Sequence, residues 1–195
     1  MFRFIGAFIF LLGFGTSFYF RRKSETIGEP VSFQEEGLFV MIILRVAGLA
    51  MWLSVIIWLL NPQWMIWSQL ALPPLIRWGG VGLGFICLPL TYWLFSSIGT
   101  NITQTVETRP DHALVTSGPY HYVRHPLYTV GITMFISFAL MAANWFIALT
   151  TVAVLVMLLI RLPVEEAKLI ERFSDDYRHY MRNTGKLLPR IQAKK

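Results

Sequence analysis

The chain alternates between long apolar runs and short polar segments. Three apolar runs cover about residues 4–20, 38–60 and 75–95, and a longer one covers residues 126–162. A run of roughly 20 apolar residues is long enough to cross the hydrocarbon core of a bilayer as a helix. The pattern therefore predicts an integral membrane protein whose first three transmembrane helices lie in the three shorter runs.

The longest apolar run is too long for a single crossing. As one helix, residues 126–162 would extend roughly 55 Å, whereas the hydrocarbon core is about 30 Å thick. Asn144 is a polar residue near the middle of the run. We therefore expect a helical hairpin that turns at Asn144 and supplies transmembrane helices four and five.

After Pro163 the spacing becomes that of an amphipathic helix. Apolar residues recur three or four positions apart, and charged residues fill the rest; the apolar positions are Leu169, Ile170, Phe173, Tyr177, Tyr180 and Met181. Gly185 and Pro189 mark its end. Pro126 and Pro163 are each expected to begin a helix, which leaves backbone N–H groups available at both points.

These elements predict an all-α fold. It has five transmembrane helices and a C-terminal cytoplasmic amphipathic helix, in one integrated domain. Residues 1–95 form a three-span membrane region, and residues 96–195 carry the candidate site. Composition agrees, because only 14% of the residues are charged, against about 25% in typical soluble domains.

The basic residues predict the orientation. Most of the 17 lysines and arginines lie in three polar segments, namely residues 21–23, Arg109 with Arg124, and the chain from Arg161 onward. Cytoplasmic loops carry such an excess, and five crossings with the N-terminus outside place all three segments there. We expect a prokaryotic inner or plasma membrane protein whose partners include membrane lipids, and the distribution argues against nucleic acid.

Two polar clusters carry the candidate chemistry. One is residues 118–128, with Tyr120, His125 and Tyr128; the other is residues 161–166, with Arg161 and Glu165. The predicted hairpin returns both to the same membrane depth. A carboxylate beside cationic and imidazole groups suits a zwitterion, such as the methionyl tail of S-adenosylmethionine, with its ammonium on Glu and its carboxylate on His, Arg or helix N–H groups.

The same residues carry a family resemblance. Residues 114–120 and 124–128, followed by Glu165-Glu166, resemble the signature of the isoprenylcysteine carboxyl methyltransferase family, as do Leu169, Phe173, Tyr177, Tyr180 and Pro189. Small prokaryotic members with five membrane helices are similar in the Arg-x-Pro-x-Glu-Glu run at 161–166 and the Thr184-Gly185 pair. The resemblance covers about residues 96–191.

The resemblance implies an S-adenosylmethionine-dependent methyltransferase of the carboxyl O-methyltransferase type. Its acceptor would be lipophilic or lipidated, such as a prenylcysteine-like carboxylate. Arg161 matches the family's substrate-side arginine, and Glu166 is an adjacent catalytic helper. The cofactor contacts would fall on His112, Ala113, Leu114, Val115, Tyr120, His125, Pro126, Leu127, Tyr128 and Glu165.

The sequence departs from the family at two positions. A glutamine contact aligns with Thr105, although Gln104 is adjacent, and Ser174 stands where glycine commonly follows the phenylalanine. O-, N- and S-methylation stay open, as does the oligomeric state.

Simpler interpretations exist for most of these residues. Arg124 and Arg161 suit headgroup anchors, the Glu pair suits a helix dipole, and the tyrosines suit an interfacial belt. His121 and His125 have a metal-like spacing without further ligands, so no metal is expected. The glycines of residues 79–84 favour close helix packing over a nucleotide loop, because no strand precedes them.

Two other functions remain open, and cofactor binding distinguishes them. A membrane NADPH-dependent steroid-type reductase shares a related His-Pro-x-Tyr motif; the alternative is a non-catalytic membrane scaffold. We expect the purified protein to retain labelled S-adenosylmethionine. Retained NADPH without S-adenosylmethionine would identify the reductase. The scaffold predicts that His125→Ala and Glu165→Ala change no ligand binding.

Overall fold

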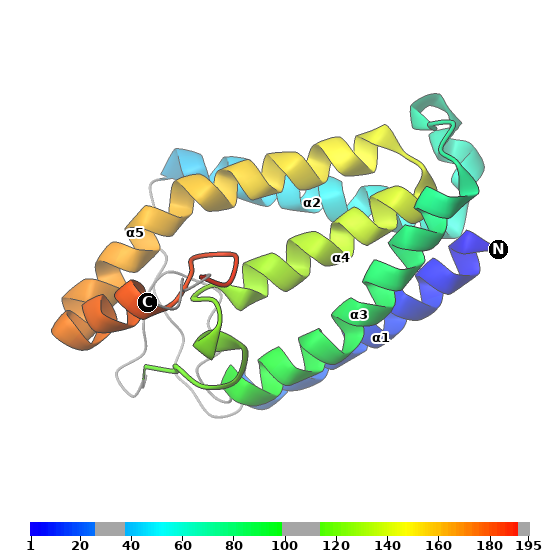
Figure 1. The fold of residues 1–195 in the computed structure, drawn as a ribbon. Coiled ribbons are helices and arrows are strands. Elements are labelled where there is room, and N and C mark those ends of the chain that lie inside the picture. Colours follow the sequence, from blue (N-terminus) through cyan, green and yellow to red (C-terminus); the bar gives the residue numbers. More distant parts are fainter. Residues whose placement is uncertain (26–37, 99–113, 191–195) are drawn as a thin grey trace.

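The structure, a computed structural model, describes residues 1–25, 38–98 and 114–190 as a bundle of helices (Figure 1). Its long helices are α1 (Phe2–Glu25), α2 (Leu38–Leu60), α3 (Pro74–Ile98), α4 (Pro126–Ala142) and α5 (Trp145–Asn183). Two short 3-10 helices, η1 (Pro62–Ser68) and η3 (Gly118–His121), lie in the connections. The described residues form no strand beyond two isolated bridges, so the predicted all-helical class is confirmed.

Four of the described helices are long and apolar enough to cross a membrane. These segments are Phe2–Arg22, Val40–Leu60, Pro74–Ser97 and Trp145–Asn183, whereas the apolar helix Pro126–Ala142 is shorter. Many large apolar side chains on α1, α2 and α3 are exposed, as expected of helices that face lipid. The chain is an integral membrane protein.

Helix α4 lies in the middle of the bundle, with α2 and α5 on one side and α1 and α3 on the other (Figure 1). The buried core runs along it and includes Phe138 and Met141, with Ile9, Val55 and Ile147 from the surrounding helices. A helix packed against others over most of its surface is apolar along most of its length, which is why α4 and α5 form one apolar run in the hydropathy pattern.

The predicted hairpin at Asn144 is confirmed. Ala143 ends α4 in a left-handed conformation with φ 50°, and Asn144 begins α5 by accepting a hydrogen bond from the Ile147 N–H at 3.1 Å. The Asn144 side-chain amide also donates to Ser68 Oγ at 2.7 Å. A buried polar residue therefore caps a helix and ties η1 to the hairpin.

The predicted helix start at Pro163 is wrong, because α5 continues through it to Asn183. Leu158, Leu162 and Glu166 are all buried, and their spacing of four puts them on one face of the helix. Packing on both sides of the proline holds this face in register, and prolines are tolerated inside such helices. Of the two prolines predicted to begin a helix, Pro126 does so as the first residue of α4.

The change of direction lies instead at Ser174, with φ 48° and ψ −119°. Glycine adopts positive φ without the steric cost that a Cβ imposes. The local geometry thus gives a physical reason for the glycine that the family commonly has there. Beyond this kink the helix turns back across the bundle end, as the orange segment of Figure 1 shows.

The glycines of residues 79–84 lie within α3 and serve helix packing. A Cβ on Gly80 would lie 2.8 Å from Leu140 Cβ and 2.9 Å from the Ser137 carbonyl oxygen of α4. One on Gly84 would lie 2.8 Å from the Ile9 side chain of α1. These two glycines, one helical turn apart, let α3 approach both neighbours closely, as the sequence indicated.

We expect Gly80→Ala to destabilise the bundle and Gly82→Ala to spare it. The added methyl of Gly80→Ala meets the α4 backbone and should lower the free energy of unfolding by about 1–3 kcal/mol. An equivalent methyl on Gly82 meets nothing within 4 Å. Thermal unfolding of both variants in detergent measures the difference, and equal midpoints would contradict the packing role.

Candidate active site

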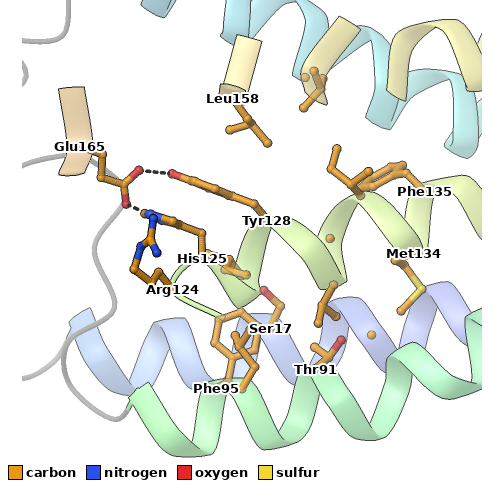
Figure 2. A pocket seen from close by; sticks show the side chains of 18 of the residues that line it. Ser17, Thr91, Phe95, Arg124, His125, Tyr128, Met134, Phe135, Leu158 and Glu165 are labelled. Atoms are coloured by element: carbon orange, nitrogen blue, oxygen red, sulfur yellow. Dashed lines mark hydrogen bonds and ion pairs between the residues drawn. The ribbon is translucent and has the colours of Figure 1, made fainter. Parts of the chain in front are cut away.

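A cavity of about 710 Å³ opens at the bundle end opposite the Asn144 turn. All five long helices contribute to its wall, together with Leu114, Val115 and Tyr120. Figure 2 shows part of this lining, with side chains from α1, α3, α4 and α5. Arg21, Arg124 and Arg161, one from each predicted basic segment, line this one space. Cavities of this size hold small-molecule ligands.

The polar part of the cavity is built around His125, which is 6% exposed. Its Nδ1 lies 3.6 Å from Glu165 Oε1, and its Nε2 lies 3.3 Å from Glu166 Oε1. Tyr128 donates its hydroxyl to Glu165 Oε2 at 2.7 Å, and its ring stacks on His125 (Figure 2). The start of α4 and the middle of α5 therefore meet at one imidazole and two carboxylates.

Burial lowers the pKa of His125, but hydrogen bonds to Glu165 and Glu166 and their negative charges outweigh it, so the pKa is raised above 6.5. The imidazolium form is thus favoured in the folded protein. Arg124 and Lys186 also approach Glu166 and share its charge.

Glu166 belongs to a different set of contacts from Glu165, although the two are adjacent. It is 5% exposed and does not line the cavity. Arg124 contacts its Oε1 through Nε at 2.9 Å and Nη2 at 2.8 Å, and Lys186 Nζ lies 3.3 Å from its Oε2. Its charge is compensated inside the protein, so its place is structural.

Residues 184–188, which we name the C-terminal clasp, cover the start of α4. Arg124 N–H donates to the Gly185 carbonyl at 2.8 Å and His125 N–H to the Lys186 carbonyl at 3.1 Å, while the Arg124 side chain donates to the Thr184 carbonyl. Thr129 Oγ1 donates to the Leu187 carbonyl at 2.7 Å. A Cβ at Gly185 would overlap the Leu188 carbonyl oxygen, so the turn requires glycine.

Most of the predicted site residues line the cavity. They are Leu114, Val115, Tyr120, His125, Leu127, Tyr128, Arg161 and Glu165. Pro126 is buried behind the wall as the first residue of α4. His112 and Ala113 lie outside the described residues, as do Gln104, Thr105 and Arg109.

The sequence analysis missed the cavity role of the helix after Pro163. Its apolar stripe reaches the cavity through Leu169, Phe173, Tyr177 and Tyr180. Tyr177 is 2% exposed, and its hydroxyl has no hydrogen-bond partner among the described residues. Tyr180 donates to the Tyr120 carbonyl. The stripe was visible in the sequence, but its target depends on the kink at Ser174.

Tyr120 adds a protonated hydroxyl to the wall. Burial raises its pKa, and the nearby Tyr180 and Glu165 raise it further. The hydroxyl is therefore available as a hydrogen-bond donor at neutral pH.

Residues 81–171 match the sequence model of the isoprenylcysteine carboxyl methyltransferase (ICMT) family, which confirms the resemblance. The fold is similar to the structure of the eukaryotic intramembrane Ras methyltransferase ICMT, solved without a monobody. The TM-score is 0.54 at 21% identity, over 85% of this chain and 56% of that one. The chain thus spans little more than half the length of that relative. No curated protein matches it.

We expect the imidazolium of His125 to make stability depend on pH. Because its folded pKa is raised, its contribution is complete below 6.5 and is lost as the pH rises through the folded pKa. The unfolding midpoint in detergent should therefore fall over this range, and less so in His125→Gln. His121→Gln, which changes an exposed histidine, is the control. An unchanged pH slope in His125→Gln would contradict the assignment.

Proposed function

Because residues 81–171 match the ICMT family model, we propose that the chain belongs to this family and is an S-adenosylmethionine-dependent methyltransferase of the membrane. Its acceptor is lipophilic, with a prenylcysteine-like carboxylate as the leading class. The observation that carries the proposal is the meeting of His125 and Glu165 in a cavity with one polar and one apolar part.

The polar part suits a zwitterionic cofactor. Glu165 offers a carboxylate to an ammonium and is held in place by Tyr128 and His125. A carboxylate at the start of α4 would meet the helix N-terminus, where Pro126 lacks an N–H and Leu127 supplies the first one. His125 adds positive charge there. The buried Tyr177 hydroxyl gains a partner when a polar ligand enters.

The remaining wall suits the adenine and the sulfonium. Leu114, Val115 and Tyr120 approach from the connection before α4, and Tyr180 approaches from the end of α5. Apolar and aromatic surfaces accept a purine and stabilise a cation at their faces. We assign His112 and Ala113 to the same contact on the family resemblance alone.

When bound, S-adenosylmethionine supplies an electrophilic methyl group, which the acceptor oxygen takes as the sulfur–carbon bond breaks, giving a methyl ester and a neutral thioether. The chain's own residues align the reactants and exclude water. Arg161, one helical turn before Glu165 and lining the same cavity, holds the acceptor carboxylate. A carboxylate is ionised at neutral pH, so no general base is required.

Glu166 is a positioning residue in this mechanism in place of the catalytic helper first suggested. Its carboxylate faces Arg124, His125 and Lys186 instead of the cavity. It orients the imidazole and fixes the start of α4 from behind.

We also propose five crossings, with the short helix α4 as the fourth span, α5 as the fifth and the N-terminus outside. Helices α4 and α5 are antiparallel about the Asn144 turn, and the three arginine-bearing segments share the cavity end. The excess of basic residues places this end in the cytoplasm.

Glu165→Gln and Glu166→Gln separate binding from structure. Glu165→Gln removes the charge facing the ammonium and should weaken S-adenosylmethionine binding at least about thirtyfold, or about 2 kcal/mol. Glu166→Gln leaves Arg124 buried without its acid, and should lower the free energy of unfolding by about 3–5 kcal/mol. Its folded fraction should lose less cofactor affinity than Glu165→Gln, because Glu166 acts on the cofactor site only through His125.

Equilibrium binding of labelled S-adenosylmethionine and thermal unfolding measure the two effects. Labelled methyl transfer to a fractionated lipid extract then tests the activity. Wild-type affinity in Glu165→Gln would overturn the cofactor site, and NADPH binding without S-adenosylmethionine binding would favour a reductase.

A further inference from the structure

The cavity continues from its polar part into the centre of the bundle. We name this continuation the apolar arm. Its sides include Gly13 of α1, Gly48 of α2 and Gly131 of α4, and Leu158 of α5 lies across from α4 in Figure 2. An apolar arm joined to a charged end has the shape of a lipid with a polar head.

Glycines keep the apolar arm open. A Cβ on Gly48 or Gly131 would meet nothing within 4 Å, because each faces the empty part of the cavity. Gly131 follows Tyr128 by three residues and so lies one helical turn deeper on the same face of α4. Glycines inside a helix lower its stability relative to alanine. Here the absence of their side chains keeps the space beneath the polar part clear.

An aromatic cluster lines the deep part of the arm. Trp52 packs edge-on against Phe135 at 5.0 Å between ring centroids and against Phe10 at 5.6 Å, and Phe138 contacts both phenylalanines at 6.1 Å. Such edge-to-face contacts support one another. Phe10, Trp52, Phe135 and Phe138 form what we call the aromatic floor.

The depth of the arm follows from the helix rise. From Tyr128 at the polar part to Phe138 at the floor, α4 advances roughly 15 Å. An extended hydrocarbon tail of roughly 12 carbons spans this distance, given carbon–carbon bonds of about 1.5 Å at tetrahedral angles.

We propose that the apolar arm limits the length of the acceptor's hydrocarbon tail. Gly48 and Gly131 admit the tail, and the aromatic floor stops it while its carboxylate head lies at Arg161. The placement of the head rests on the proposed function, whereas the tail limit rests on the cavity alone.

Methyl transfer to a series of S-alkyl-N-acetylcysteines tests the limit. With tails of roughly 8, 12, 16 and 20 carbons, we expect kcat/KM to fall at least about tenfold beyond the length that fits, a loss of about 1.4 kcal/mol. Gly131→Leu should move the fall to shorter tails, and Phe138→Ala should move it to longer ones. Gly48→Leu, from the opposite wall, repeats the test where Gly131→Leu fails to fold.

Gly15→Leu is the matched control. Its added side chain also begins in open space, but Gly15 does not line the cavity. It should therefore leave the tail preference unchanged.

A binding readout separates this inference from the methyltransferase assignment. Alkyl tails brominated at the far end should quench Trp52 fluorescence, measured as the difference from Trp52→Phe, only when the bromine reaches the floor. Length-dependent quenching that Gly131→Leu abolishes, without methyl transfer to any tail, would support the arm and refute the proposed function. Equal transfer to every tail in wild type and Gly131→Leu would overturn the length limit and leave the proposed function standing.

Discussion

The buried ion cluster at Glu166 holds the functional end of the bundle together. One carboxylate contacts Arg124, His125 and Lys186, which come from the segment before α4 and from the C-terminal clasp. Breaking a buried pair of this kind costs about 3–5 kcal/mol, because the remaining charge stays out of water. The start of α4, the middle of α5 and the chain after α5 are thereby fixed relative to one another, and the cavity walls depend on that arrangement.

Glu165 and Glu166 are adjacent in sequence but make different contacts, because they point in different directions from the helix. Successive residues on a helix are rotated by about 100°, so Glu165 reaches the cavity while Glu166 reaches the clasp. His125 lies between them and contacts both carboxylates. The Glu166 carboxylate therefore both holds the His125 imidazole and stabilises the fold through the clasp. This shared contact couples the binding site to the C-terminal segment.

The cavity combines a polar part and an apolar part. Its polar part lies where the connections meet at the bundle end, and its apolar arm extends among α1, α2 and α4. The proposed methyl transfer, from a charged cofactor to a lipophilic acceptor, needs both environments within reach of one reacting atom. Helix α4 supplies the link, since it carries His125 and Tyr128 at its start and Phe135 and Phe138 deeper in the bundle.

Hydropathy and motif spacing predict the all-helical membrane fold, the turn at Asn144, the family resemblance and the pairing of His125 with Glu165, because these features depend on local composition. The remaining features depend on packing between distant segments. Packing of Leu158, Leu162 and Glu166 carries α5 through Pro163, and the positive φ of Ser174 then turns Tyr177 toward the cavity. Which of two neighbouring acids faces a ligand, and how deep a cavity runs, depend on contacts between segments far apart in the chain, and no local pattern records those contacts.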